Sequence, residues 1–166
     1  MKLHWRTFDA LGLSRIVQLI NKTNQFNLTT RRYTDADVQA VMDDPQSFGL
    51  QLRLIDRFGD NGIIAIVIGR VRDGIAALDT WLMSCRVLGR QVEETTLNLV
   101  AAEARKLGAH ALLGEYRPTA KNSMVKAHYE KLGFAPAGAT ADGGDLWRLD
   151  LDTFAFTESF IEVIDA

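Results

Sequence analysis

Cysteine and excess positive charge are both scarce in this chain, and each shortage excludes a class of protein. Only one of its 166 residues is a cysteine, which excludes an internal disulfide framework and a cysteine-rich zinc site. Lys and Arg number 19 against 21 Asp and Glu, which gives a formal net charge of −2. Because binding to a phosphate backbone needs a local excess of cations, nucleic acid is not expected as the main partner.

Long apolar runs are absent too. The longest, Ile63–Ile68, is far too short to cross a bilayer, and the N-terminal residues lack the apolar segment of a secretion signal. The three histidines form no pair at metal-ligand spacing. We therefore expect a cytoplasmic protein with no membrane segment and no metal.

Ordinary globular proportions, 47% hydrophobic and 24% charged residues, predict one domain over residues 1–166. Hydrophobic periodicity predicts four helices: one at 11–20, one after the Thr34–Asp37 capping box, one that ends at Lys106 and one at 124–132. It also predicts strands at 50–57, at 63–70, from Asp79 onward, at 111–116 and in a final hairpin. This order predicts one mixed α+β sheet with an antiparallel meander and a single crossover helix. The tail, 154–166, is either an extra strand or an interface segment.

The stretch Asp79–Glu94 is the centre of this pattern. Trp81, Met83 and Cys85 alternate in an apolar strand, and helical spacing begins near Gln91. A helix N-terminus leaves its first N–H groups without internal partners, and a glycine in the turn before it lets an anion approach them. The turn therefore predicts a pyrophosphate site.

The residues around this turn allow more than one interpretation. Cys85, the only thiol, is either a small core residue or a nucleophile whose thiolate is favoured by neighbouring arginines. Glu115 either accepts a proton beside the cleft or forms a surface ion pair. Asp79 could serve the same pocket.

The polar residues 21–30 form either a solvated connector or a lip over a substrate pocket. Arg31 and Arg32, which follow, could meet a phosphate or the acidic helix of a carrier protein. Consecutive residues of an extended chain point to opposite sides, so at most one of them is expected to reach a given ligand.

The element order, the turn R-V-L-G-R-Q at 86–91 and the segment N-S-M-V-K-A-H-Y-E-K-L-G-F at 122–134 together resemble the GNAT acyltransferase superfamily. The resemblance implies the GNAT fold, a mostly antiparallel mixed sheet flanked by helices, with a turn that grips the pyrophosphate of an acyl-CoA. It also implies that Tyr129 protonates the leaving thiolate, although packing of Tyr129 against Phe134 in the core is an equal alternative. The residues implied to bind CoA or phosphopantetheine are Arg86, Leu88, Gly89, Arg90, Gln91, Val92 and Asn122.

Four longer segments, at 23–33, 56–62, 81–90 and 114–122, resemble the C-terminal GNAT-like domain of FkbH-like proteins. In that family a phosphatase-like domain of the haloacid dehalogenase type precedes this one, and a glyceryl group is loaded on an acyl carrier protein for polyketide-like pathways. The Asp-rich phosphatase motif is missing here. The domain is therefore either the C-terminal part of a longer FkbH-like protein or the partner of a separate phosphatase.

Three functions follow from these patterns. The first is an acyltransferase that handles a glyceryl or other acyl thioester on acyl carrier protein or CoA. The second is an acetyl-CoA-dependent N-acetyltransferase of a small amine, and the third is a non-catalytic carrier-protein docking module. Gln91 replaces the second small residue of the family turn, which favours the first and third functions over the second.

Overall fold

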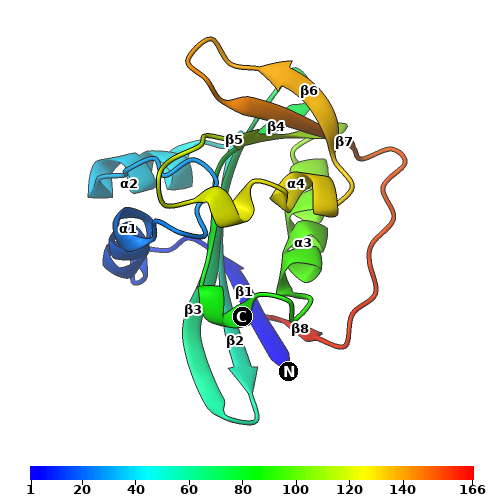
Figure 1. The fold of residues 1–166 in the computed structure, drawn as a ribbon. Coiled ribbons are helices and arrows are strands. Elements are labelled where there is room, and N and C mark those ends of the chain that lie inside the picture. Colours follow the sequence, from blue (N-terminus) through cyan, green and yellow to red (C-terminus); the bar gives the residue numbers. More distant parts are fainter.

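A single eight-stranded sheet divides the computed structural model, which describes residues 1–166, into two layers of helices (Figure 1). The strands, in the sheet order β6-β7-β5-β4-β3-β2-β1-β8, are β1 (Lys2–Thr7), β2 (Ser47–Asp56), β3 (Gly59–Arg72), β4 (Ile75–Met83), β5 (Ala111–Tyr116), β6 (Ala135–Ala139), β7 (Asp145–Asp150) and β8 (Glu162–Asp165). The helices are α1 (Leu13–Lys22), α2 (Asp35–Asp43), α3 (Val92–Lys106) and α4 (His128–Lys131), with 3-10 turns η1 (Cys85–Val87) and η2 (Ser123–Val125).

The predicted α+β architecture is confirmed. Strands β2, β3 and β4 form the expected antiparallel meander. Helix α3 then crosses over to β5, which pairs with β4 in parallel. The run Ile63–Ile68 lies in the middle of the sheet, where helices cover both faces, and this explains why it is apolar without alternation.

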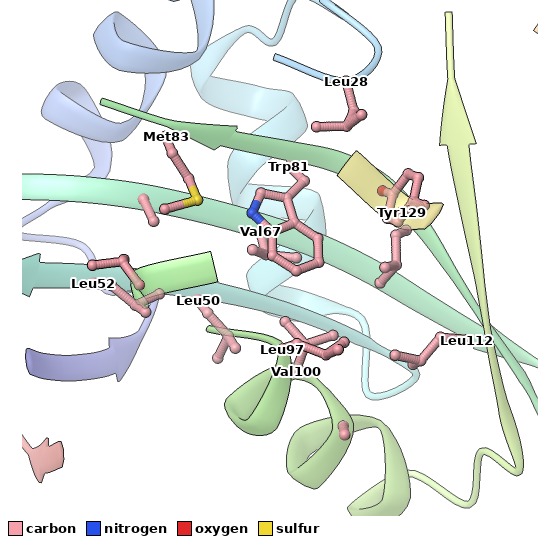
Figure 2. Close-up of a cluster of buried hydrophobic side chains, with 14 of the residues drawn as sticks. Leu28, Leu50, Leu52, Val67, Trp81, Met83, Leu97, Val100, Leu112 and Tyr129 are labelled. Atoms are coloured by element: carbon pink, nitrogen blue, oxygen red, sulfur yellow. The ribbon is translucent and has the colours of Figure 1, made fainter. Parts of the chain in front are cut away.

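Two hydrophobic clusters hold the layers together. The larger lies between the sheet and α3, and Figure 2 shows Trp81 at its centre with Tyr129 beside it and Leu97 of α3 on the other side. The smaller joins Ile16 of α1 and Val38 of α2 to the opposite face of the sheet. Each fully buried large side chain contributes roughly 1.5–3 kcal/mol to folding.

Both ends of the chain add strands to the same edge of the sheet. Strand β1, which the sequence did not predict, pairs with β2 on one side and with β8 on the other. The tail thus forms an extra strand, one of its two predicted alternatives. Before β8 it runs along α3, where the Asn98 side chain bonds Thr157.

The predicted helix at 124–132 is wrong in its length. Only His128–Lys131 is α-helical, after the separate turn η2. Asn122 therefore precedes the helix that carries Tyr129 instead of sharing it. The capping box is confirmed, because the Thr34 hydroxyl accepts from the Asp37 N–H while the Asp37 carboxylate accepts from the Thr34 N–H.

Candidate functional site

Strands β4 and β5 pair only along their first halves and then separate. Their register runs from Ile75 opposite Ala111 to Leu78 opposite Gly114. At the point of separation β4 carries a bulge, because Ile68 faces Thr80 while Gly69 faces Leu78, which leaves Asp79 without a partner. A bulge redirects its extra residue, so this side chain is aimed out of the regular sheet pattern.

Residues Phe26–Thr29, the inserted segment, fill the gap between the two separated strands. The Leu28 N–H donates to the Trp81 carbonyl at 3.0 Å, the Met83 N–H donates to the Phe26 carbonyl at 3.1 Å, and the Arg117 N–H donates to the Leu28 carbonyl at 2.8 Å. All four residues of the segment are buried. The prediction of a solvated connector is therefore wrong for this segment, which forms an isolated antiparallel bridge with β4, between Asn27 and Leu82, and one bond to Arg117 just after β5.

Asn122 fixes the inserted segment to the end of β5. This fully buried side chain donates to the Asn27 carbonyl and to the Arg117 carbonyl, each at 3.0 Å, and its oxygen accepts from the Thr119 N–H at 2.8 Å. Its expected contact with backbone is present. Contact with a pantetheine chain stays a prediction, since the amide is fully occupied within the protein.

Three buried polar side chains beside the gap have no hydrogen-bond partner. They are Trp81 Nε1, His128 Nε2 and Tyr129 OH. Their rings pack edge to face, with the Trp81 and His128 centroids 4.5 Å apart and the His128 and Tyr129 centroids 5.1 Å apart. Burial lowers the pKa of His128 to about 3 and raises the pKa of Tyr129, so both remain neutral near pH 7.

The Tyr129 ring covers Gly114 of β5 so closely that a Cβ at this glycine would lie 2.5 Å from the ring. Tyr129 also packs against Phe134, with 4.8 Å between ring centroids, which confirms the predicted core contact. A protonated hydroxyl without a partner can donate a proton. Its role toward a leaving thiolate stays a prediction.

A cavity of about 400 Å³, the Asp79 cavity, opens over the bulge on the α2 side of the sheet. Its polar and charged lining residues are Arg31, Tyr33, Asp44, Ser47, Arg70, Asp79 and Glu115. Arg31 bonds Asp79 and Glu115 at 2.9 Å each, and the Tyr33 hydroxyl also bonds the Asp79 carboxylate. Burial raises the pKa of Asp79, Arg31 opposes this effect, and Glu115 adds to it.

Glu115 forms the ion pair that was one of its two predicted roles. Its carboxylate bonds Arg31 at 2.9 Å and Arg117 at 3.0 Å, and its side chain is 16% exposed. It also lines the Asp79 cavity, so a role near the acceptor remains a prediction. Arg31 is the arginine of the Arg31-Arg32 pair that enters this cavity, and it is neutralised there by carboxylates of the same chain.

The turn before α3 lies where the sequence predicted it. Gly89 and Gln91 both adopt left-handed backbone conformations, with φ of 73° and 64°, and α3 follows at Val92. This conformation is unusual for a residue with a Cβ. The Gln91 side chain turns away from the helix axis and accepts from the Phe160 N–H in the tail at 3.2 Å.

Both arginines of the turn bind groups of the same chain. Arg86 donates to Ser84 Oγ and to the Asn61 carbonyl, each at 3.3 Å. Arg90 pairs with the Asp56 carboxylate at 2.7 Å. Neither side chain reaches over the N-terminus of α3 in this arrangement.

Carboxylates occupy the first turn of α3. Burial raises the pKa of Glu93, Glu94 adds to this effect, and the backbone N–H groups of Glu93 and Gly89 oppose it. Glu93 Oε1 and Glu94 Oε2 are buried without a hydrogen-bond partner, so this turn carries uncompensated acidic groups where a pyrophosphate would bind. Phosphate binding by the backbone of Leu88 to Val92 stays a prediction.

Cys85 lies outside the strand. Strand β4 ends at Met83, and the Cys85 thiol is exposed, 3.6 Å from Gln25 Oε1. Its interpretation as a core residue is therefore wrong. A covalent role is not excluded by burial and stays a prediction.

Solved structures share this fold at low sequence identity. The GNAT domain of S. lividans PAT matches with a TM-score of 0.66 and 20% identity over 88% of this chain and 89% of that chain. The ribosomal-protein-S18-alanine N-acetyltransferase from Escherichia coli matches with a TM-score of 0.65 and 18% identity over 95% and 99%. The spermidine N-acetyltransferase from Vibrio cholerae, in complex with CoA and spermine, matches with a TM-score of 0.65 and 12% identity over 91% and 96%.

The chain has the GNAT fold. No protein-family model and no curated protein sequence matches it. At these identities the GNAT likeness establishes the fold, and the finer resemblance to FkbH-like proteins stays a prediction from the sequence.

This GNAT fold departs from an open thioester cleft in two places. The backbone groups of Trp81 and Met83 in β4, and of Arg117 just after β5, are paired with the inserted segment. The first turn of α3 carries Glu93 and Glu94, whose negative charge opposes a bound anion there. A phosphopantetheine arm that pairs with β4 would therefore have to displace the inserted segment.

No group of three His, Cys, Asp or Glu side chains is placed to hold a metal ion. None of the helices combines the length and apolar character needed to cross a membrane.

Proposed function

We propose that this chain is an acyltransferase that moves an acyl group from a thioester to a hydroxyl or amine acceptor bound in the Asp79 cavity. The observation that carries the proposal is the half-buried Asp79 carboxylate at the β4 bulge, which lines a cavity large enough for a small acceptor. Burial raises the pKa of this carboxylate, and a raised pKa makes it a stronger base once it is ionised.

In this proposal Asp79 accepts the proton of the acceptor O–H or N–H while the acceptor oxygen or nitrogen attacks the thioester carbonyl. Arg31 and Tyr33 hold the carboxylate in place through their hydrogen bonds. A C–O or C–N bond forms, the C–S bond breaks, and the Tyr129 hydroxyl donates its proton to the leaving thiolate. Burial supports this last role, since it raises the pKa of Tyr129 and keeps the hydroxyl protonated.

The donor in this proposal is the phosphopantetheine thioester of an acyl carrier protein or of CoA. Its arm carries amide groups, which can replace those of the inserted segment on the backbone of β4 and β5. The FkbH-like resemblance extends the proposal to a glyceryl or similar acyl group and a polyketide-like pathway, with a haloacid-dehalogenase-type phosphatase as a further partner. The acceptor amine of an N-acetyltransferase, as in the spermidine enzyme named above, is the variant that the same cavity would also accommodate.

A specific observation favours a second function, a carrier-protein docking module without chemistry of its own. The inserted segment occupies backbone groups of β4 that would hold a donor. A domain that never admits a thioester could keep these contacts permanently. The two functions differ in whether Asp79 and Tyr129 meet a substrate.

Acyl transfer from acetyl-CoA and from an acyl-loaded carrier protein to a panel of amines and alcohols tests the proposal, with product read by mass spectrometry. Asp79→Asn should lower the rate about 10²- to 10⁴-fold while the melting temperature changes little. Tyr129→Phe should slow release of the thiol while leaving acceptor binding intact. Binding of carrier protein with no product from any donor would overturn the enzyme and favour the docking module.

A further inference from the structure

A second cavity, of about 640 Å³, lies on the same face of the sheet, beside α1 and the end of β4. Four cationic side chains line it, and no Asp or Glu does, so we name it the cationic cavity. Its cations are Arg15, Lys22, Arg86 and Lys121.

None of these four cations forms an ion pair, although the chain as a whole has more acids than bases and nine other Lys, Arg or His residues are paired with Asp or Glu. Overall composition therefore does not explain the local excess. Like charges that surround one hollow repel one another and create a positive potential inside it. A bound anion would relieve that repulsion.

The four side chains reach the cavity from three separate parts of the chain. Arg15 and Lys22 come from α1, Arg86 from η1, and Lys121 from the loop before η2. Hydrogen bonds to Ser84 Oγ and the Asn61 carbonyl hold the Arg86 guanidinium in its orientation. The fold thus gathers and partly orients these charges instead of scattering them.

We infer that the cationic cavity binds the phosphate group of a small organic phosphate. A phosphate monoester carries close to two negative charges near pH 7 and has several acceptor oxygens. It can therefore bind several Lys and Arg side chains at once, whereas a carboxylate ligand offers one charge and two oxygens. The volume leaves room for an organic part. This site differs from the turn before α3, where Glu93 and Glu94 place negative charge, and the inference does not depend on acyl transfer.

Isothermal titration with inorganic phosphate, at constant ionic strength set by chloride, tests the inference. The double variant Lys22→Gln/Lys121→Gln should weaken phosphate binding about ten-fold or more. The control Lys2→Gln/Lys126→Gln removes the same two charges from exposed positions outside the cavity and should keep affinity within about two-fold of the unmodified chain. Equal weakening in both variants, or no binding at millimolar phosphate, would overturn the inference.

Three probes then identify the source of the phosphate: inorganic phosphate, pantetheine and 4′-phosphopantetheine. Tighter binding of phosphopantetheine than of the other two supports the site and makes it the place where the donor's phosphate docks. Equal affinity of phosphopantetheine and inorganic phosphate supports the site with a different organic phosphate as its ligand. Pantetheine that binds as tightly as phosphopantetheine would contradict a phosphate site.

Cys85 provides a second readout, because it is the only thiol and it lines the cavity. The positive potential should make Cys85 react faster with a dianionic aromatic disulfide than with neutral iodoacetamide, relative to free glutathione. Saturating phosphate and the Lys22→Gln/Lys121→Gln variant should each remove most of this preference, and the control variant should retain it. A preference that persists in the cavity variant would show that these cations do not act there.

Discussion

The two cavities on the α1–α2 face of the sheet differ in whether their cationic side chains have acidic partners. In the Asp79 cavity Arg31 is held by two carboxylates, whereas in the cationic cavity no cation has an acidic partner. A balanced network keeps a half-buried carboxylate in place for proton transfer, and an unbalanced one attracts an anion. A net charge of −2 for the whole chain reveals neither arrangement.

Asn122 and Lys121 are neighbours in the sequence but lie in different surroundings. The buried Asn122 amide holds the inserted segment through three hydrogen bonds, while the exposed Lys121 side chain lines the cationic cavity. Asn122→Ala should lower the free energy of unfolding by about 2–4 kcal/mol, because it removes three hydrogen bonds of a fully buried amide and leaves the buried Asn27 carbonyl without this partner. Lys121→Ala should change it by no more than about 0.5 kcal/mol, and urea denaturation measures both.

The same pair of variants tests whether the inserted segment blocks the thioester gap. Loss of its anchor should loosen residues 26–29 and speed amide exchange at Leu28 in Asn122→Ala but not in Lys121→Ala. Equal exchange rates in the two variants would mean that backbone pairing alone holds the segment. Tighter binding of phosphopantetheine by Asn122→Ala would identify the segment as its competitor.

His128, beneath the inserted segment, should make stability depend on pH. Its pKa falls from 6.5 to about 3 in the fold, because burial disfavours the charged form. Between these values the unfolded chain binds more protons than the folded chain, so stability is full above about pH 7 and decreases as the pH falls below 6.5. The loss should approach about 1.4 kcal/mol per pH unit.

Urea midpoints between pH 5 and 7.5 measure this slope, and His128→Phe is the matched variant because it keeps an aromatic ring without a titrating group. The difference between the two slopes isolates the histidine from the carboxylates of the Asp79 cavity. Identical slopes would mean that His128 gains protons in the fold as readily as in the unfolded chain.

Local pattern was enough to predict most of the elements but not the two cavities. The apolar run at 63–68, the spacing that forms α3 and the capping box at Thr34 each act over a few neighbouring residues. The segment 26–29 has the composition of a loop, and it becomes interior only because Asn122, 95 residues from Asn27, satisfies its backbone. The cationic cavity likewise combines residues as distant as Arg15 and Lys121, which no sequence window brings together.

The pH profile of acyl transfer should distinguish the residues around Asp79. The acid limb of the rate should lie above the usual range for Asp, because burial raises the pKa of this base and transfer requires its ionised form. Arg31→Gln should move the limb to higher pH and Glu115→Gln to lower pH, each by about one unit or less. Lys22→Gln, in the cationic cavity, should leave the pH of the acid limb unchanged. An acid limb that does not shift in Arg31→Gln or Glu115→Gln would argue against Asp79 as the base.

The smallest expected effect concerns the unpaired cations themselves. Without a bound anion, Lys22→Gln/Lys121→Gln should raise stability slightly, by no more than about 0.5 kcal/mol at low salt, because it removes like charges from one hollow. In 0.5 M NaCl, where the Debye length is roughly 4 Å, the gain should disappear. With saturating phosphate the sign should reverse, since the unmodified chain alone is then stabilised by its ligand. Melting temperatures of the two proteins under these three conditions test this prediction. A gain in stability that depends on neither salt nor phosphate would show that the four cations do not repel one another in the cavity.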